Sequence, residues 1–361
     1  MVMIYRYMRN IFFTIIIAST FSSCENDSNK IVFESKSHLK GIPFSVNNLE
    51  ISSPQKILAS KNILIIIDQT KNNFIKIIDL NKNKLICQFG QKGKGPNEIL
   101  LLSDAWIDEN NNNLELLDLK LGIMYIISLD SLPIKNLESA KKIYIQGPKQ
   151  FKRMKPSHVI RLNDSLFIGS GFFDSGRFVL MDGDGRFLRT FDDFEFYGKE
   201  FSSYSDIEKC IILQGQFTCY MPLGLFAFAT SSSACIQFYK QQDNKVQTTR
   251  KLNYYVDPGQ KTDGSVASSR NIPFGFLSIT SNLDNVFLLY SGKRFDKYNN
   301  SIVYGERVFV YDWEGSAKEE LDLDKSLIDI CYCEEKKSLI GISVSPEPEL
   351  ILYKYDKKFT K

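Results

Sequence analysis

The sequence contains few residues of the types on which most catalytic and metal sites depend. Histidine occurs only twice, at His38 and His158. The seven cysteines form no Cys-x-x-Cys pair and no grouping with histidine, which excludes the common zinc-binding patterns. No Gly-x-Ser-x-Gly motif occurs, so a serine hydrolase would have to use one of the two histidines. We therefore expect no catalytic residue, no metal and no cofactor, and a binding protein rather than an enzyme.

A strong excess of charge of one sign is also absent. The chain has 45 Lys and Arg residues against 42 Asp and Glu residues, and no run of five or more like charges. A nearly neutral protein lacks the basic patch with which proteins bind nucleic acid. We therefore expect no nucleic-acid partner.

The apolar segment near the N-terminus is too short to span a bilayer, which takes about 20 residues. This segment, Ile11–Ala18, follows two arginines and precedes "STFSSC", which ends at Cys24. A charged start, an apolar centre and small residues before a cysteine are the layout of a secretory signal, and the ending resembles a bacterial lipobox. We expect residues 1–23 to be a lipoprotein signal peptide and residues 24–29 to be a lipidated cysteine with a short tether. The alternative is a plain signal peptide with an incidental cysteine.

A lipid on Cys24 would hold the protein at a membrane surface. Loss of the signal peptide removes two arginines, so the mature chain has 43 basic against 42 acidic residues. We expect a monomer in the cell envelope, anchored at the outer membrane on its periplasmic or surface side.

Six cysteines remain once Cys24 is set aside, and an exported protein can form disulfides. Cys210 with Cys219 is the favoured pair, whereas buried free thiols are the commoner alternative. Cys331 and Cys333 lie two apart on one strand face, where a bridge does not form readily.

Short β-rich runs recur along the rest of the chain. One class of run occurs at residues 63–68, 114–119, 166–171, 225–230, 286–292 and 339–344. A second class follows each of these runs, at 74–80, 123–129, 178–185, 235–240, 307–315 and 350–356. Six such pairs, 51 to 61 residues apart, predict an all-β fold, a six-bladed β-propeller of four-stranded antiparallel blades. A solenoid and a β-sandwich are the alternatives.

The two ends of the chain suggest how the ring closes. Only five residues follow the run 350–356, so the sixth blade lacks its outermost strand. An incomplete blade would leave an unpaired edge. We predict that Lys30–Ser35 supplies the missing strand, and that the propeller spans residues 30–361.

The glycine-rich stretch "FGQKGKGPNEIL", residues 89–100, raises the question of phosphate binding. A P-loop needs Lys after its second spaced glycine, but Pro96 stands there, and the third glycine of a dinucleotide loop is missing. The stretch instead predicts a connection between a strand at 85–89 and the first strand of the next blade at 99–108.

This stretch also resembles a family signature, G-x-x-G-x-G-P-G-E-F, in which Asn97 and Ile99 replace the usual Gly and Phe. The matching positions are Gly90, Gly93, Gly95, Pro96 and Glu98. The signature is that of six-bladed TolB-like and NHL-like propeller lipoproteins of Gram-negative gut bacteria. The resemblance extends over most of the chain and implies a cell-envelope binding protein.

Three long connections between blades, at 146–160, 191–210 and 253–276, are the predicted ligand-binding regions. They mix basic and aromatic residues, which suit stacking on sugars or clamping a carboxylate. The candidate ligand-binding residues are Lys152, Arg153, His158, Tyr204, Tyr254, Tyr255 and Arg270. For each of them the alternative is an ordinary structural or solvated loop residue.

We predict that the protein recognises a glycan or a small, including anionic, ligand on this inter-blade loop face, without catalysis. One alternative is a protein-docking scaffold in an envelope complex, which a broad apolar patch would favour. The other is a metal-dependent lactonase or lyase-like hydrolase, which a cluster of oxygen ligands on the axis would favour.

Overall fold

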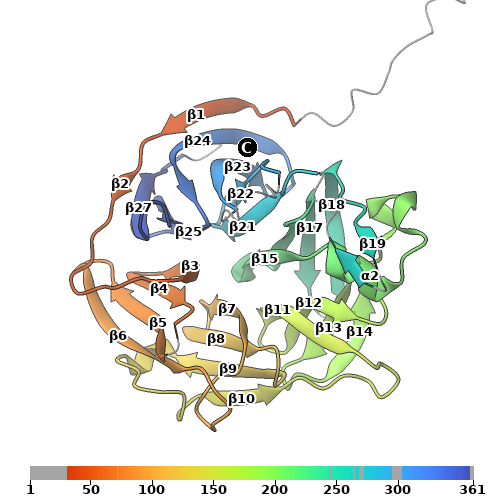
Figure 1. The fold of residues 1–361 in the computed structure, drawn as a ribbon, viewed down its shortest axis with the longest axis horizontal. Helices are drawn as coiled ribbons and strands as arrows, with labels where there is room; N and C mark the ends of the chain where they lie inside the picture. Colours follow the sequence, from red (N-terminus) through yellow and green to blue (C-terminus); the bar gives the residue numbers. More distant parts are fainter. Residues whose placement is uncertain are drawn as a thin grey trace, which may run out of the picture. The chain divides into compact units, whose positions relative to one another are not determined.

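The computed structural model describes residues 31–70, 72–243, 245–262, 265–267, 272–294 and 303–357. One compact unit begins at Phe33 and contains every described strand. Its strands form six sheets of four or five strands around a common axis (Figure 1). This arrangement is a six-bladed β-propeller and confirms the predicted fold class.

Each blade contributes its strands from the axis outward. The innermost strands are β3 (Pro54–Ser60), β7 (Leu102–Asp108), β11 (Met154–Asn163), β15 (Gly215–Tyr220), β21 (Phe276–Ser281) and β25 (Asp329–Cys333). The second strands are β4 (Ile63–Asp68), β8 (Asn113–Asp118), β12 (Leu166–Phe173), β16 (Leu225–Thr230), β22 (Asn285–Tyr290) and β26 (Ser338–Ser343). The third strands are β5 (Asn72–Asp79), β9 (Ile123–Ser128), β13 (Phe178–Asp182), β17 (Ala234–Gln242), β23 (Gly305–Asp312) and β27 (Glu349–Lys354). The outermost strands are β6 (Lys84–Gln91), β10 (Lys141–Tyr144), β14 (Phe187–Phe191), β18 (Lys245–Tyr255), β24 (Ala317–Leu327) and β2 (Ile42–Pro43).

The two classes of apolar run in the sequence are the second and third strands of the blades. These strands are continuously apolar because each blade packs against a neighbour on both faces, so its middle strands have no solvent face. In β4, for example, every residue after Ile63 is buried. One core cluster joins Ile57 and Leu64 of blade 1 to Ile340 and Ile342 of blade 6. The core therefore lies between the blades.

Ring closure uses a different N-terminal segment from the predicted one. β2 pairs antiparallel with β27 and completes blade 6. The predicted segment Lys30–Ser35, whose first residue lies outside the described ranges, does not close the ring. Phe33 packs its ring against Phe309 at 4.8 Å, which holds this part of the chain on blade 5. There β1 (Ser35–Leu39) adds a fifth strand parallel to β24, and only then does the chain reach blade 6.

A buried carboxylate joins the two ends of the chain to blade 5. Glu319 of β24 is fully buried and accepts hydrogen bonds from Lys357 Nζ at 2.5 Å and Tyr355 Oη at 3.2 Å. The Ser37 hydroxyl of β1 also hydrogen-bonds to it. The N-terminal strand and the C-terminal segment are thus held by one side chain.

Two inter-blade connections contain structure of their own. The connection from β14 to β15 holds η2 (Glu195–Tyr197), η3 (Lys199–Phe201) and α2 (Asp206–Ile212). The connection from β18 to β21 forms the hairpin β19 (Gln260–Thr262) and β20 (Ser265–Ala267), which lies beside α2 in Figure 1. The remaining short helices are η1 (Leu129–Ser131) and η4 (Met221–Leu223). Within the described ranges, no helix combines the length and hydropathy needed to cross a bilayer.

The glycine-rich stretch is a connection between β6 and β7, as predicted. The Glu98 carboxylate folds back and accepts the Gly95 backbone N–H at 2.7 Å. A Cβ atom at Gly93 would lie 1.9 Å from Glu98 Oε2, so only glycine fits there. Gly90 has φ +93°, and the carbonyl of Pro96 accepts a hydrogen bond from Lys142 Nζ at 2.7 Å. The family motif therefore builds one tight turn.

Cys210 and Cys219 do not form the favoured disulfide; both thiols are free, as in the commoner alternative. Cys210 Sγ faces the carbonyl of Gly176 in the turn between β12 and β13, whereas Cys219 Sγ faces that of Arg161 in β11, so the two thiols have different surroundings. Cys331 and Cys333 are also free, in agreement with their spacing on one strand.

Candidate functional site

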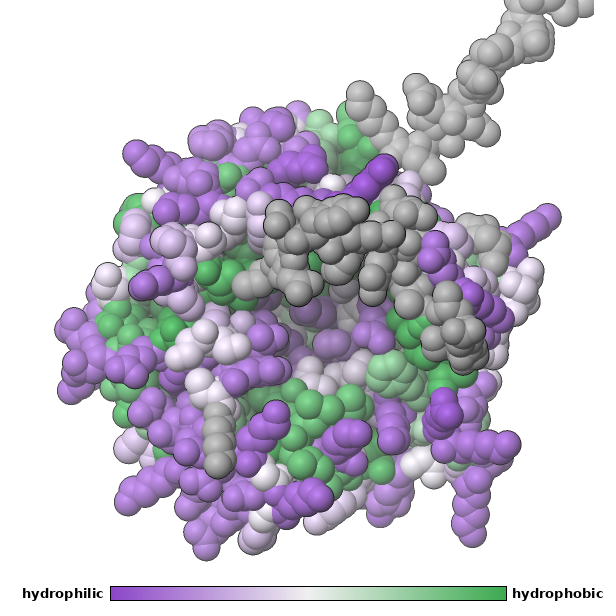
Figure 2. All heavy atoms as spheres, in the orientation of Figure 1, coloured by the Kyte–Doolittle hydropathy of each residue, from purple (hydrophilic) through white to green (hydrophobic). Residues whose placement is uncertain are grey.

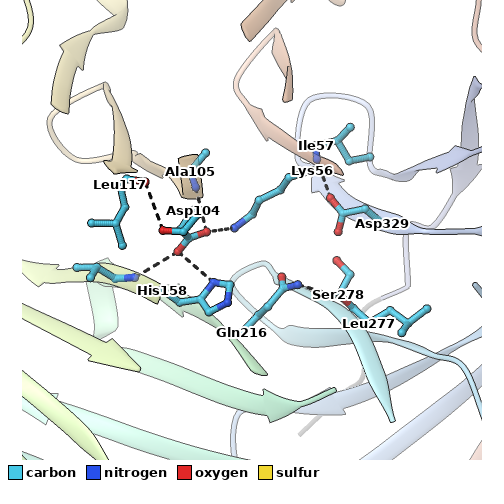
Figure 3. Close-up of polar contacts among 12 residues, drawn as sticks. Lys56, Ile57, Asp104, Ala105, Leu117, His158, Gln216, Leu277, Ser278 and Asp329 are labelled. Carbon is cyan, nitrogen blue, oxygen red and sulfur yellow. Dashed lines mark hydrogen bonds and ion pairs between the residues drawn. The ribbon is translucent and has the colours of Figure 1, made fainter. Parts of the chain in front are cut away.

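Six polar side chains occupy one level of the channel that the innermost strands surround. Each belongs to a residue that pairs with the fifth residue of the second strand in its blade. They are Lys56, Asp104, His158, Gln216, Ser278 and Asp329, here called the channel ring (Figure 3). In four of the six blades a register shift lies directly before the ring residue, and such bulges re-aim side chains.

The channel ring links neighbouring blades. The innermost strands have no further strand beyond them, so their inner backbone groups need other partners. Asp329 Oδ2 accepts the Ile57 N–H of the next blade at 2.6 Å. Asp104 Oδ2 accepts the N–H of Val159 at 3.2 Å, and Gln216 Nε2 donates to the carbonyl of Leu277 at 3.0 Å. Part of the ring is therefore structural.

The two carboxylates of the channel ring, Asp104 and Asp329, differ in how closely positive charge lies beside them. Lys56 Nζ lies 2.5 Å from Asp104 Oδ1, and His158 Nδ1 lies 3.5 Å from Asp104 Oδ2. Burial raises the pKa of Asp104, but Lys56 and His158 outweigh burial and bring that pKa down to about 2. Burial raises the pKa of Asp329 to about 6, and the hydrogen bonds from Ser278 and Ile57 reduce this effect only in part.

A cavity of about 320 Å³ extends along the axis from the channel ring to one end of the propeller. Its inner part is lined by Lys56, Ser278 and Asp329. Its outer part is lined by the residues that follow five of the innermost strands, namely Lys61, Glu109, Met221, Asn282 and Glu334. We call this the turn end, because the turns between first and second strands lie there. The inter-blade connections join the opposite ends of the innermost strands.

Trp106 of β7 lines this cavity and carries a buried hydrogen-bond donor. Its Nε1 atom is buried, yet among the described residues it has no hydrogen-bond partner. A buried donor without a partner costs about 1–3 kcal/mol, which a ligand oxygen would recover. The cavity wall also contains the hydroxyl groups of Thr218 and Ser281, whose oxygens lie 2.8 Å apart.

The mouth of the cavity carries interacting charges. Glu109 is exposed but lies in a concave opening, where partial loss of hydration and repulsion from Glu334 raise its pKa. A hydrogen bond with Ser60 and the Lys61 ammonium oppose this shift. Within the described part of the chain, no three His, Cys, Asp or Glu residues are grouped so as to hold a metal ion.

Of the residues predicted to bind ligand, His158 is a member of the channel ring. Lys152 and Arg153 are exposed before β11. The three tyrosines form internal contacts: Tyr204 Oη reaches the Gly259 carbonyl at 3.5 Å, Tyr254 Oη lies 2.9 Å from Tyr311 Oη, and Tyr255 Oη donates to the Phe274 carbonyl at 3.0 Å. No hydrogen bond or ion pair joins these side chains to one another within the described part of the chain, so the structure does not gather them into one site. Arg270 and Cys24 lie outside the described residues.

Sequence reasoning missed Lys56, Trp106 and Asp329. Ring residues precede the second strand of their blade by seven to nine residues, because bulges and turns vary in length. A fixed repeat therefore does not align them. The usable signal is a polar residue directly before an apolar run in the first strand, as Lys56 stands before "ILA" in β3.

The architecture and the axial cavity define a six-bladed β-propeller with a polar channel. The chain belongs to the TolB-like 6-blade propeller-like family, whose model matches residues 30–335. This match confirms the TolB-like propeller part of the resemblance seen in the glycine-rich stretch. No curated protein matches the chain.

Two solved structures share the fold at low sequence identity. A candidate exported protein of Bacteroides fragilis is 13% identical, with a TM-score of 0.54 over 90% of this chain and 100% of its own. A member of the duf4221 family from Bacteroides vulgatus is 9% identical, with a TM-score of 0.54 over 92% of this chain and 99% of its own. At these identities the likeness concerns the fold alone.

Proposed function

We propose that this protein is a cell-envelope binding protein that takes a small, hydroxyl-rich ligand, such as a glycan unit, into its axial cavity. The observation that carries the proposal is Trp106, which lines a cavity that also has hydroxyl groups in its wall and whose buried N–H has no hydrogen-bond partner among the described residues. The volume of this cavity lies at the lower end of the range for ligand pockets, roughly 300–1,000 Å³, which suits a small ligand. The indole also offers an apolar face against which a sugar ring can stack. The ligand is bound without chemistry.

The proposed site differs in place from the predicted one. The inter-blade connections were predicted to hold the ligand, whereas the cavity opens at the turn end. The large exposed apolar side chains of the described chain come from separate elements, for example Tyr144, Leu188 and Leu223. Hydrophobic residues in Figure 2 likewise occupy several smaller areas within a mostly hydrophilic face. Small-ligand binding therefore has more support than the docking scaffold.

Envelope location and lipid anchoring are part of the proposal. Residues 1–23 act as the signal peptide, lipid is attached to Cys24, the tether ends at residue 29, and the propeller occupies 30–361. The likeness to a candidate exported protein agrees with this address. Because β1 runs parallel to β24, Ser35 lies at the turn end. The first described strand therefore begins at the end where the cavity opens.

The test uses tryptophan fluorescence of a soluble form that starts at Glu25 and keeps every described strand. The chain has two tryptophans, so Trp313→Phe leaves Trp106 as the single reporter. We expect a neutral sugar from a panel of glycans, organic acids and divalent ions to change Trp106 emission in a saturable manner. The same ligand should raise the melting temperature, because it binds only the folded state.

Trp106→Phe is the matched variant, since it keeps an aromatic ring and removes the N–H. It should weaken binding of the same sugar about tenfold, the value of one hydrogen bond near 1.4 kcal/mol. Because this variant lacks the fluorescent reporter, the rise in melting temperature with sugar concentration measures its affinity and that of the parent protein. Stabilisation by a divalent ion that EDTA reverses would support the metal-dependent alternative. If no compound on the panel alters emission or melting, the proposal fails and the docking scaffold takes its place.

A further inference from the structure

We infer that the ligand of the axial cavity carries a protonated amine besides its hydroxyl groups, as a 2-amino sugar does. The inference rests on the proposed function and names the class of ligand for that same site. It follows from which charges around the cavity are compensated and which are not.

The inner end of the cavity offers negative charge. Lys56 is the cation there, but its ammonium is already paired with Asp104 at 2.5 Å. Asp329, which is 3% exposed, lies next to it on the cavity wall. Its hydrogen-bond donors, the Ser278 hydroxyl and the Ile57 backbone N–H, are neutral. Among the described residues it forms no ion pair, and the Lys56 charge acts on it only at longer range. A carboxylate held in this way attracts a cation.

The charged residues at the mouth of the cavity also leave an excess of negative charge. Glu334, Lys61 and Glu109 follow the innermost strands of blades 6, 1 and 2, so Lys61 lies between two carboxylates. The cavity wall, together with Asp104 that pairs with Lys56, contains four carboxylates and two ammonium groups. The carboxylates are Asp104, Glu109, Asp329 and Glu334, and the ammonium groups are Lys56 and Lys61. Negative charge therefore remains at both ends, and anionic ligands are repelled.

The uncharged polar groups in the rest of the cavity wall suit a ligand with hydroxyl groups. Trp106 Nε1 needs an acceptor, whereas Ser278 and Thr280 hydrogen-bond to backbone atoms of β25 and present oxygen to the cavity. Hydroxyl groups both donate and accept, so they can satisfy this mixed wall. An inorganic cation or a simple alkylamine would leave the Trp106 N–H without a partner. A small sugar that bears an amine supplies both the positive charge and the hydroxyl groups that this cavity can bind.

The experiment compares three probes of similar size, glucosamine, glucose and glucuronate, by calorimetric titration of the soluble form at about pH 7 and low salt. Glucosamine should bind about tenfold more tightly than glucose, and glucuronate should bind most weakly, because uncompensated carboxylates favour a cation. The preference for glucosamine should shrink in high salt, which screens the exposed mouth charges.

Glu109→Gln and Glu334→Gln should each reduce the ratio of glucosamine to glucose affinity about threefold, since each removes one exposed charge. Glu335→Gln is the matched control, because Glu335 is exposed next to Glu334 but does not line the cavity. Equal binding of glucose and glucosamine, or tighter binding of glucuronate, overturns the inference and leaves the proposed function standing. If none of the three binds while another panel compound alters Trp106 emission, the ligand class is wrong; if no compound does, the proposed function itself fails.

Discussion

Replacing Asp329 by asparagine should stabilise the propeller at neutral pH. Asp329 is almost completely buried, and burial raises its pKa from 3.8 to about 6. A shift of roughly two units, at about 1.36 kcal/mol each, means that folding loses about 3 kcal/mol whenever this carboxylate is ionised. Asparagine keeps an oxygen that accepts the Ile57 N–H and carries no charge. The free energy of unfolding of Asp329→Asn should therefore rise by about 3 kcal/mol at pH 7.5.

The sign of the pH dependence follows from the raised pKa. Above about pH 6 the folded protein carries the full cost of the buried charge. As the pH falls from 6 toward 4, the folded state binds a proton that the unfolded state does not, so the wild-type protein recovers stability. The advantage of Asp329→Asn should therefore vanish near pH 4. Urea unfolding of both proteins at several pH values measures this difference.

Asp104→Asn is the matched control, with the opposite sign. Lys56 and His158 outweigh burial and lower the pKa of Asp104 to about 2, so its charge stabilises the fold above the ordinary aspartate pKa and stops doing so as pH falls through 2. At pH 7 this variant should lose about 2 kcal/mol, because the Lys56 ammonium loses its partner. The reasoning is refuted if both asparagine variants change stability in the same direction, or if the gain at Asp329 persists at pH 4. A gain in stability with weaker glucosamine binding would show that Asp329 is kept for ligand rather than for folding.

Three further predictions concern the closure of the ring, the glycine turn and the thiols. Glu319→Ala should lower the free energy of unfolding by about 2 kcal/mol in urea, because a fully buried carboxylate with partners on both chain ends is lost, whereas Glu347→Ala at an exposed position should change little. Gly93→Ala should destabilise by about 1–3 kcal/mol through its clash with the Glu98 carboxylate, and the additional change Glu98→Ala should recover part of the loss; additive effects would contradict this contact. Thiol titration of the unfolded soluble form, without reductant, should find six reactive cysteines, and four would indicate a disulfide.

The sequence predicted the blades well because their second and third strands are buried on both faces. A strand such as Ile63–Asp68 must be continuously apolar wherever it stands in a propeller, so the pattern survives in all six blades. The glycine-rich turn was predictable for a similar reason. Gly93, Gly95 and Glu98 contact one another within a few residues, so the geometry is encoded locally.

The closing strand was located a few residues too early. A strand propensity in Lys30–Ser35 is visible in the sequence, but the choice between blade 5 and blade 6 is not. That choice depends on contacts between segments nearly 300 residues apart, such as Ser35 with Glu319 and Ile42 with Leu352. Composition cannot reveal such pairings.

By itself, then, the sequence determined the all-β class, the six blades, the turn that carries the family motif and an N-terminal segment with the layout of a lipoprotein signal. Only the tertiary structure decided which segment closes the ring, which polar residues form the channel ring and where the cavity opens. The physical reason is how far apart in the sequence the interacting residues lie. Strand burial and tight turns depend on neighbours in the chain, whereas the cavity is built from single residues of separate blades that converge only on the common axis.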